Sequence, residues 1–188
     1  MIPIMSNPIF EHFAETARLT LSAGQTLFRL GQEVADIFLV LSGRIALERH
    51  TPHGQRLVLQ TAGPGTILAE ASAYSRQYHC DAVARETSTV AMMPKAQFLA
   101  MLAQEPSLAV AWATALARGV QAARLKAEIR TLPRLQDRLD AWLDAGHKLP
   151  PKGQWQEVAD ELGVTREAFY RELARRRRAH KSFTEPPA

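Results

Sequence analysis

The chain has 188 residues, of which 46% are hydrophobic and 22% charged, a composition typical of a globular protein with one core or two small domains. Its single cysteine, Cys80, excludes an internal disulfide framework and any four-cysteine zinc or iron–sulfur site built within one chain. The N-terminus lacks a basic segment followed by an apolar run, and no stretch approaches the roughly 20 apolar residues of a membrane helix. We therefore expect a cytoplasmic protein without a membrane partner.

The charge is unevenly distributed along the chain. Residues 1–117 carry 8 Lys/Arg against 9 Asp/Glu, and residues 118–188 carry 15 against 10, so the formal +4 divides into −1 and +5. Four arginines run together near the end, at residues 175–178. A basic cluster of this kind attracts polyanions, although alone it is equally typical of a solvated helix end.

The segment from Leu19 to Met93 has the pattern of an all-β domain. Short apolar runs are separated by glycine and proline turns, at a spacing of about 8 to 12 residues that is typical of a sandwich or barrel. In I-A-L-E-R and R-L-V-L-Q, apolar and polar residues alternate with period two, which predicts strands with one buried face. The stretch R-Q-Y-H-C-D-A around Cys80 leads into one of the last strands.

After Pro94 the pattern becomes helical. Residues 107–132 contain no proline and carry a stripe that repeats every three or four residues and predicts one long helix. Small residues on this stripe would let a second helix come close, so we expect dimerisation through Trp112, Leu116, Val120, Ala123 and Ala127. An alternative, in which the stripe packs only on its own domain, stays open.

Pro133 ends this helix, and residues 133–188 have the spacing of a helix-turn-helix domain. We expect an apolar face on a first helix, a tight turn with positive φ at Gly163, and a second helix capped by Thr165. Phe169 and Leu173 would pack back on the first helix. Basic residues on the free face predict binding to DNA, through Thr165, Arg166, Glu167, Tyr170, Arg171 and the run Arg175, Arg176, Arg177 and Arg178.

The order of these elements resembles that of the Crp/Fnr superfamily of bacterial transcription regulators over residues 18 to 180. Three sequence motifs carry the resemblance: A-G-Q-x-L-F-x-x-G, D-x-x-F-L-V-L-S-G-R-I-A-L and A-G-P-G-T-I-L-A-E. The resemblance implies an α+β fold. It consists of a jelly-roll-like, cyclic-nucleotide-binding-like double-stranded β-helix over residues 1–106, a dimerisation helix over 107–132 and a helix-turn-helix domain over 133–188. It also implies a palindromic operator with half-sites similar to TGTGA, and RNA polymerase as a partner.

T-R-E-A-F-Y-R resembles the recognition helix of that family, which places Arg166, Glu167 and Arg171 in the major groove. Arginine grips guanine through two bonds, and glutamate accepts from cytosine. The family's wing, a strand pair after the recognition helix, is not expected here because A-H-K-S-F-T-E-P-P-A has no apolar alternation. We therefore expect Arg175 to Arg178 to take over phosphate contacts. Glu172 occupies a position where a buried aliphatic residue is usual.

The family's ligand motif is altered. Cyclic-nucleotide-binding members have Gly-Glu for the ribose and, ten residues later, Arg-Ser for the phosphate, whereas this chain has Ala69-Glu70 and Cys80-Asp81. An aspartate at the phosphate position adds like charge, so we do not expect cyclic nucleotide binding. Arg76 on the preceding loop is the remaining cation that could reach in.

Three interpretations of the effector pocket, predicted at Glu70, His79, Cys80 and Asp81, stay open. In the first, the pocket has lost its ligand and Cys80 is an inert buried side chain. In the second, Cys80 is a redox thiol or binds a metal or haem with His79, although neighbouring strand residues point to opposite faces. In the third, the cavity holds another small effector.

No nucleophile–base pair or metal-ligand spacing supports an enzyme. The sequence predicts a homodimeric, sequence-specific DNA-binding transcription regulator with an effector-sensing β-domain. The alternative is a β-domain that binds a protein or small molecule, joined to a degenerate DNA-binding domain.

Overall fold

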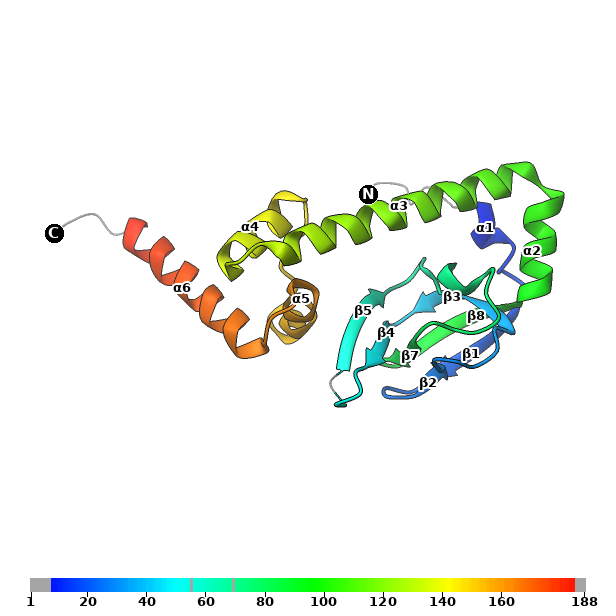
Figure 1. The fold of residues 1–188 in the computed structure, drawn as a ribbon, viewed down its shortest axis with the longest axis horizontal. Coiled ribbons are helices and arrows are strands. Elements are labelled where there is room, and N and C mark those ends of the chain that lie inside the picture. The colour runs from blue at the N-terminus through cyan, green and yellow to red at the C-terminus, as the bar shows by residue number, and fades with distance from the viewer. Residues whose placement is uncertain (1–7, 55, 69, 185–188) are drawn as a thin grey trace. The chain divides into compact units, whose positions relative to one another are not determined.

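The computed structural model describes residues 8–54, 56–68 and 70–184 (Figure 1). The chain forms two compact units, Met1–Val120 and Gln121–Ala188. The boundary falls within the helix α3, Pro106–Thr131, at whose two ends the sequence had placed the domain boundaries. Each unit has its own hydrophobic core.

The first unit is an antiparallel β-roll that follows a short helix α1, Pro8–Glu11. Its eight strands form two four-stranded sheets, in the orders β1-β8-β3-β6 and β2-β7-β4-β5. The strands are β1 Ala17–Leu21, β2 Thr26–Phe28, β3 Asp36–Ser42, β4 Ile45–His50, β5 Arg56–Ala62, β6 Ile67–Leu68, β7 Asp81–Ala84 and β8 Ser88–Pro94. The predicted β-roll is thus confirmed, and only the two-residue strand β6 had no expected counterpart.

The period-two pattern places alternate residues of β4 in the core of the roll. Ile45 lies opposite Ala84, and Leu47 lies opposite Ala82, and all four side chains belong to the buried cluster of this unit. Cys80 is two residues before Ala82 and belongs to the same cluster. The strand pattern therefore directs Cys80 toward the interior of the roll.

Gly43 makes the tight turn between β3 and β4. Its φ is 79°, and a Cβ at this position would lie 2.3 Å from Ser88 Oγ and 2.5 Å from the Thr87 carbonyl oxygen. The Ser88 hydroxyl accepts a hydrogen bond from the Arg44 N–H, at 3.0 Å. Both the left-handed conformation and the close approach require glycine here.

The helix α2, Lys95–Gln104, and the first half of α3 pack on the β-roll. Trp112 is only 4% exposed and meets Phe98 edge-on, with ring centroids 5.0 Å apart. Leu116 is half-buried against the same core. The dimerisation role predicted for Trp112 is therefore wrong, because helical periodicity identifies an apolar face without showing which neighbour covers it.

The second unit contains the end of α3, followed by α4 Leu135–Asp144, a 3-10 turn η2 Lys152–Gln154, α5 Trp155–Leu162 and α6 Arg166–Thr184. Its core consists of Ile129, Leu139, Trp142, Trp155, Val158, Ala159, Leu162, Phe169 and Leu173. Among the described residues after Pro94 there is no strand, as expected for a domain without a wing. None of the described helices combines the length and apolar character needed to cross a membrane.

Candidate nucleic-acid interface and effector pocket

The turn between α5 and α6 has the geometry that the sequence predicts. Gly163 is left-handed, with φ 68° and ψ 40°, and its N–H donates to the carbonyl oxygens of Ala159 and Asp160. Thr165 Oγ1 accepts a hydrogen bond from the Ala168 N–H at 3.2 Å, so Thr165 caps α6. The predicted turn and cap are both confirmed.

Apolar side chains hold the two helices together across this turn. Val158 and Leu162 of α5 are buried, at 3% and 0% exposure, and Phe169 and Leu173 of α6 lie in the same cluster. Phe169 is fully buried. This packing leaves the opposite face of α6 exposed.

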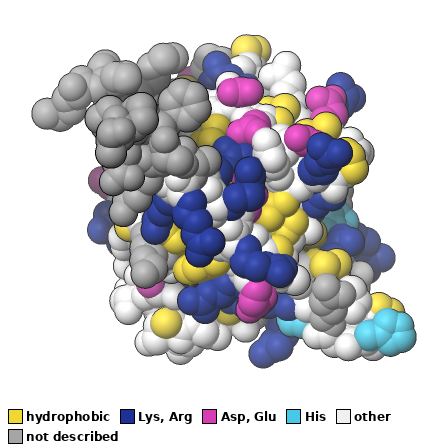
Figure 2. Space-filling view, turned by 90° about the vertical axis from the view of Figure 1, so that its left-hand side faces the viewer, with side chains coloured by type: hydrophobic (Ala, Val, Ile, Leu, Met, Phe, Trp, Pro, Cys, Tyr) yellow, Lys and Arg dark blue, Asp and Glu magenta, His cyan; other side chains and the backbone are white. Residues whose placement is uncertain are grey.

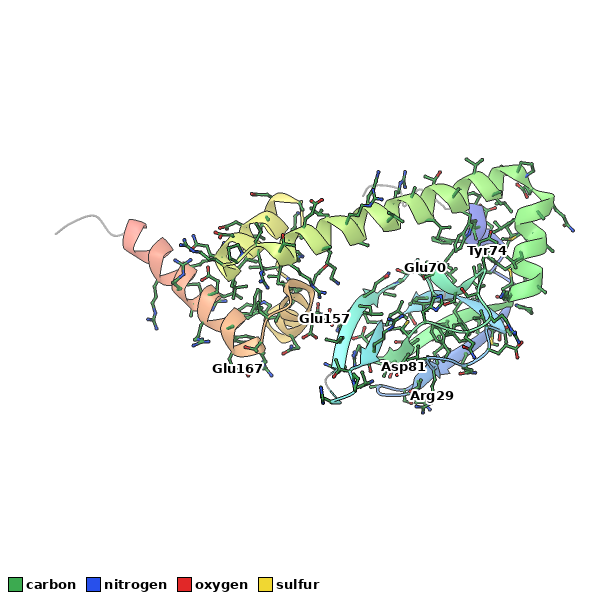
Figure 3. All side chains as sticks on the ribbon, in the orientation of Figure 1. Arg29, Glu70, Tyr74, Asp81, Glu157 and Glu167 are labelled. Carbon is green, nitrogen blue, oxygen red and sulfur yellow. The ribbon has the colours of Figure 1, made fainter. Side chains whose placement is uncertain are left out.

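The side chains predicted to read bases lie on that exposed face. Arg166, Glu167 and Arg171 are exposed, and Glu167 lies in the first turn of α6 (Figure 3). Tyr170 is half-buried, with the Arg166 guanidinium 5.2 Å from its ring centroid. The Tyr170 ring meets Trp155 at the start of α5 at 5.1 Å. Arginine, carboxylate and aromatic groups are thus grouped on one surface.

Arg175 and Arg176 form an ion-pair network with α4. Both guanidinium groups donate to the Glu172 carboxylate, at 2.7 to 2.8 Å, and Arg176 Nη1 also donates to Asp140 Oδ1 at 2.6 Å. Arg175 Nη2 donates to Gln136 Oε1 at 3.0 Å. These two arginines fasten α6 to α4, and the phosphate contacts expected of the run 175–178 stay a prediction.

Glu172 is the centre of this network. Hydrogen bonds from Arg175 and then Arg176 lower the pKa of its carboxyl to about 2. The carboxylate is therefore ionised at every pH at which the protein is expected to work. This accounts for a charged residue where an aliphatic one is usual, since Leu173 fills the adjacent core position at 5% exposure.

The last two arginines of the run extend along α6 with exposed side chains. The Arg177 guanidinium lies over the Trp155 ring, 5.0 Å from its centroid. Figure 2 shows Lys and Arg side chains spread over this side of the molecule, with few acidic groups among them. Between residues 166 and 178 the sequence has six arginines and two glutamates. The surface is suited to a polyanion.

The predicted effector pocket contains two buried groups from the β-roll. Glu70, in the 3-10 turn η1 Glu70–Ser72, has its Oε2 buried without a hydrogen-bond partner among the described residues, and burial raises its pKa. Cys80 is 9% exposed. Burial and then the Glu70 carboxylate raise the pKa of its thiol to about 11. The Cys80 thiol is therefore protonated near neutral pH.

The other two predicted pocket residues make contacts elsewhere. His79 is exposed, and its Nε2 lies 3.2 Å from Ser75 Oγ. Asp81 Oδ1 accepts a hydrogen bond from the Leu30 N–H at 2.7 Å, and Asp81 starts β7 (Figure 3). His79 and Cys80 thus point apart. No group of three or more His, Cys, Asp or Glu side chains that could hold a metal ion occurs in the described ranges.

Arg49 is a pocket residue that the sequence analysis missed. Its Nε donates to the His79 carbonyl oxygen at 2.6 Å, and its positive charge partly offsets the rise of the Cys80 pKa. The pairing of β4 with β5 shifts register between Leu47 and Glu48, so simple alternation did not identify the face on which Arg49 lies. Arg76 lines an open crevice with Glu33 and Gln77. Ala69 lies outside the described residues.

Comparison with known proteins supports this description. Residues 18–105 match the family profile of the cyclic nucleotide-binding domain. No curated protein matches the sequence.

Solved structures that are similar in fold to this chain include the following three. The c-di-GMP-responsive global regulator CLP of Xanthomonas campestris is 21% identical over 92% of this chain and 91% of its own, with a TM-score of 0.70. A CRP-family transcriptional regulator of Thermus thermophilus is 19% identical over 86% of this chain and 85% of its own, with a TM-score of 0.65. The sensor domain of the regulator DNR of Pseudomonas aeruginosa is 25% identical over 65% of this chain and 80% of its own, with a TM-score of 0.52.

Proposed function

Because residues 18–105 belong to the cyclic nucleotide-binding domain family and the chain has the fold of the Crp/Fnr transcription regulators, we propose that this protein binds specific sequences of double-stranded DNA as a homodimer. The predicted resemblance to that superfamily is confirmed. DNA binding and dimerisation go further, and each is argued from the residues below.

The exposed face of α6 carries the proposal. Arg166 and Arg171 present guanidinium groups that can donate two hydrogen bonds to guanine O6 and N7, and Glu167 can accept from cytosine N4. The Thr165 cap and the Gly163 turn fix the start of this helix. We propose that α6 lies in the major groove with these three side chains toward the base edges.

The phosphate contacts fall to a smaller set than the sequence predicts. Arg175 and Arg176 are occupied by Glu172, Asp140 and Gln136. We assign backbone contacts first to Arg177 and Arg178, because both side chains are exposed near the end of the basic run. Such contacts strengthen binding to all sequences alike and make it salt-dependent.

Selection of binding sites from a pool of genomic fragments tests the proposal. We expect a palindromic sequence with half-sites about one helical turn, or about 34 Å, apart. Arg171→Ala should weaken the selected site by about 1–3 kcal/mol and relax preference at one base pair. Arg29→Ala is the matched control, because Arg29 is exposed in the first unit. No enriched sequence at moderate salt would favour a degenerate DNA-binding domain.

Dimerisation is proposed through an exposed stripe of α3. Val110 and Val120 are 66% and 49% exposed, Ala113 and Ala117 lie between them at spacings of three and four residues, and Ala127 follows Val120 after seven residues, on the same face. Val120 and Ala127 belong to the predicted stripe, and Ala123, also exposed, lies at its edge. Light scattering should give twice 20.9 kDa, and Val120→Glu should give the monomer mass.

The residues present do not fit a cyclic nucleotide. The position that needs a cation for the phosphate holds Cys80 and Asp81, and Asp81 is bonded to the Leu30 N–H. Arg49 is held by the His79 carbonyl oxygen. We propose that the pocket does not bind cyclic AMP or cyclic GMP, and calorimetric binding at micromolar concentration would refute this.

A redox or metal role for Cys80 has little support from its surroundings. A thiol with a pKa of about 11 is protonated near neutral pH, whereas the thiolate is the nucleophile and the metal ligand. We propose that Cys80 is a core side chain. If Cys80→Ser abolished a response of DNA binding to metal or oxidant while the fold remained intact, Cys80 would be a sensor.

A further inference from the structure

The C-terminal end of α5 is held by two arginines that lie outside the helix-turn-helix. Arg130 Nη2 and Nε donate to the carbonyl oxygens of Asp160 and Glu161, at 2.8 and 3.0 Å. Arg138 Nη1 donates to the carbonyl oxygen of Leu162 at 3.1 Å. The last three carbonyl groups of α5 therefore all accept from guanidinium groups.

Backbone caps satisfy only part of this helix end. The carbonyl groups in the last turn of a helix lack partners within the helix. The Gly163 N–H reaches the carbonyl oxygens of Ala159 and Asp160, and the Val164 N–H reaches Ala159 again at 3.0 Å. The arginines supply partners to Glu161 and Leu162, the two residues next to the turn, and their positive charge suits the negative end of the helix dipole.

The two arginines connect this turn to the elements that precede it. Arg130 lies in the last turn of α3, and Arg138 lies in α4. Arg138 Nε also donates to the carbonyl oxygen of Leu132, just after α3, at 2.7 Å. Arg130 touches the turn itself, because a Cβ at Gly163 would lie 3.5 Å from Arg130 Nε. The Arg138 guanidinium thus bridges the end of α3 and the end of α5.

We propose that Arg130 and Arg138 are positioning residues for DNA reading. They hold the turn that sets the direction of α6 relative to the end of α3, and they contact no DNA themselves. This inference rests on the proposed function. If the clamp is lost, α6 reads the bases less accurately while the phosphate contacts remain, so specific binding falls more than non-specific binding.

DNA affinity with two variants and a control tests the clamp. Arg130→Ala should lower affinity for the selected site about tenfold, because it removes both hydrogen bonds from Arg130 to the end of α5. Its salt slope should equal that of the wild type, because no phosphate contact is removed. Arg130→Lys keeps one donor and should recover part of the specific affinity. Arg134→Ala removes the same charge from an exposed neighbour and should change nothing.

Two outcomes would overturn the clamp. A salt slope lowered by about one in Arg130→Ala would make Arg130 a phosphate contact. Equal affinities for Arg130→Ala and Arg134→Ala would leave the arginine without a positioning role.

Hydrogen exchange of the full chain separates failure of the clamp from failure of the proposed function. The amides of residues 163–168 should exchange faster in Arg130→Ala than in Arg134→Ala, with melting temperatures that show both variants folded. If the wild type selected no DNA sequence, the proposed function would fail. Unchanged exchange at these amides would then still refute the clamp.

Discussion

Two glutamates, one in each unit, have pKa values shifted in opposite directions by their surroundings. In the second unit, hydrogen bonds from Arg175 and Arg176 lower the pKa of Glu172 to about 2. In the β-roll, burial raises the pKa of Glu70, and one of its oxygens has no partner among the described residues. The first carboxylate is fully paired with two arginines, whereas the second is buried and receives only backbone hydrogen bonds.

The two glutamates belong to different kinds of site: Glu172 supports the exposed charged surface of α6, and Glu70 lies in the predicted effector pocket of the β-roll. On α6 the Glu172 carboxylate pairs with Arg175 and Arg176, Arg176 also pairs with Asp140 of α4, and Arg166, Glu167 and Arg171 have exposed side chains. Around Glu70 and Cys80 the cation that a cyclic phosphate needs is missing from its usual place.

The largest effect should come from removing the core contact behind α6. Phe169→Ala should cost about 3–5 kcal/mol in the second unit, because Phe169 is fully buried. Phe28→Ala in the β-roll, where Phe28 stacks on Tyr78 at 4.0 Å, is the matched change. Urea unfolding with hydrogen exchange in each unit measures both. If each variant destabilised both units equally, the two regions would not be separate in stability.

The next effect concerns the Glu172 carboxylate. Glu172→Gln should destabilise the second unit by about 1–3 kcal/mol near neutral pH, since it weakens hydrogen bonds to two arginines. A lowered folded-state pKa gives stability that is present above the usual value of 4.5 and lost as pH falls toward about 2. The melting temperatures of the wild type and the variant should therefore differ at pH 6 and become equal as the pH is lowered to 2. A constant difference at all pH values would assign the effect to packing.

Glu70→Gln should have a smaller effect of the opposite sign. A raised folded-state pKa means that the folded protein holds the proton more tightly, so stability falls as pH rises above 4.5. The amide does not ionise, and the variant should therefore melt at a slightly higher temperature than the wild type near neutral pH. Glu15→Gln, at an exposed residue of the same unit, is the control. A lower melting temperature for Glu70→Gln would mean that the carboxylate has a stabilising partner.

The smallest effect is expected at Cys80. With a thiol pKa of about 11, alkylation by iodoacetamide near pH 8 should be much slower than that of a free cysteine. Cys80→Ala should change DNA affinity less than about twofold, because the residue lies in the core of the other unit. Alkylation at the rate of free cysteine would contradict the raised pKa and would support Cys80 as a redox sensor.

Local patterns predicted most of the fold. Period-two alternation and glycine punctuation identified seven of the eight strands, and β6 was missed because two residues are too short to show a period. The turn at Gly163 and the cap at Thr165 were predicted because both depend on neighbours within a few residues.

Long-range contacts were beyond these patterns. Nothing local indicates that Arg176 binds Asp140, 36 residues earlier, or that Trp112 packs on Phe98 rather than on a second chain. The place of Arg49 depends on a register shift between two strands, which alternation alone does not reveal. The basic run was visible in the sequence, but its hydrogen bonds to Gln136 and Asp140 were not.

The ion-pair network at Glu172 has a consequence for how the recognition helix can vary. A hydrophobic contact tolerates sliding and rotation of one helix on another. The hydrogen bonds from Arg175 and Arg176 to Gln136 and Asp140 of α4 accept only a narrow range of angles. Charged networks often add little net stability compared with apolar packing. At this position the protein therefore gains a defined rotational setting of α6, and substitutions on the outer face can change the side chains that α6 presents without changing how the helix packs on α4.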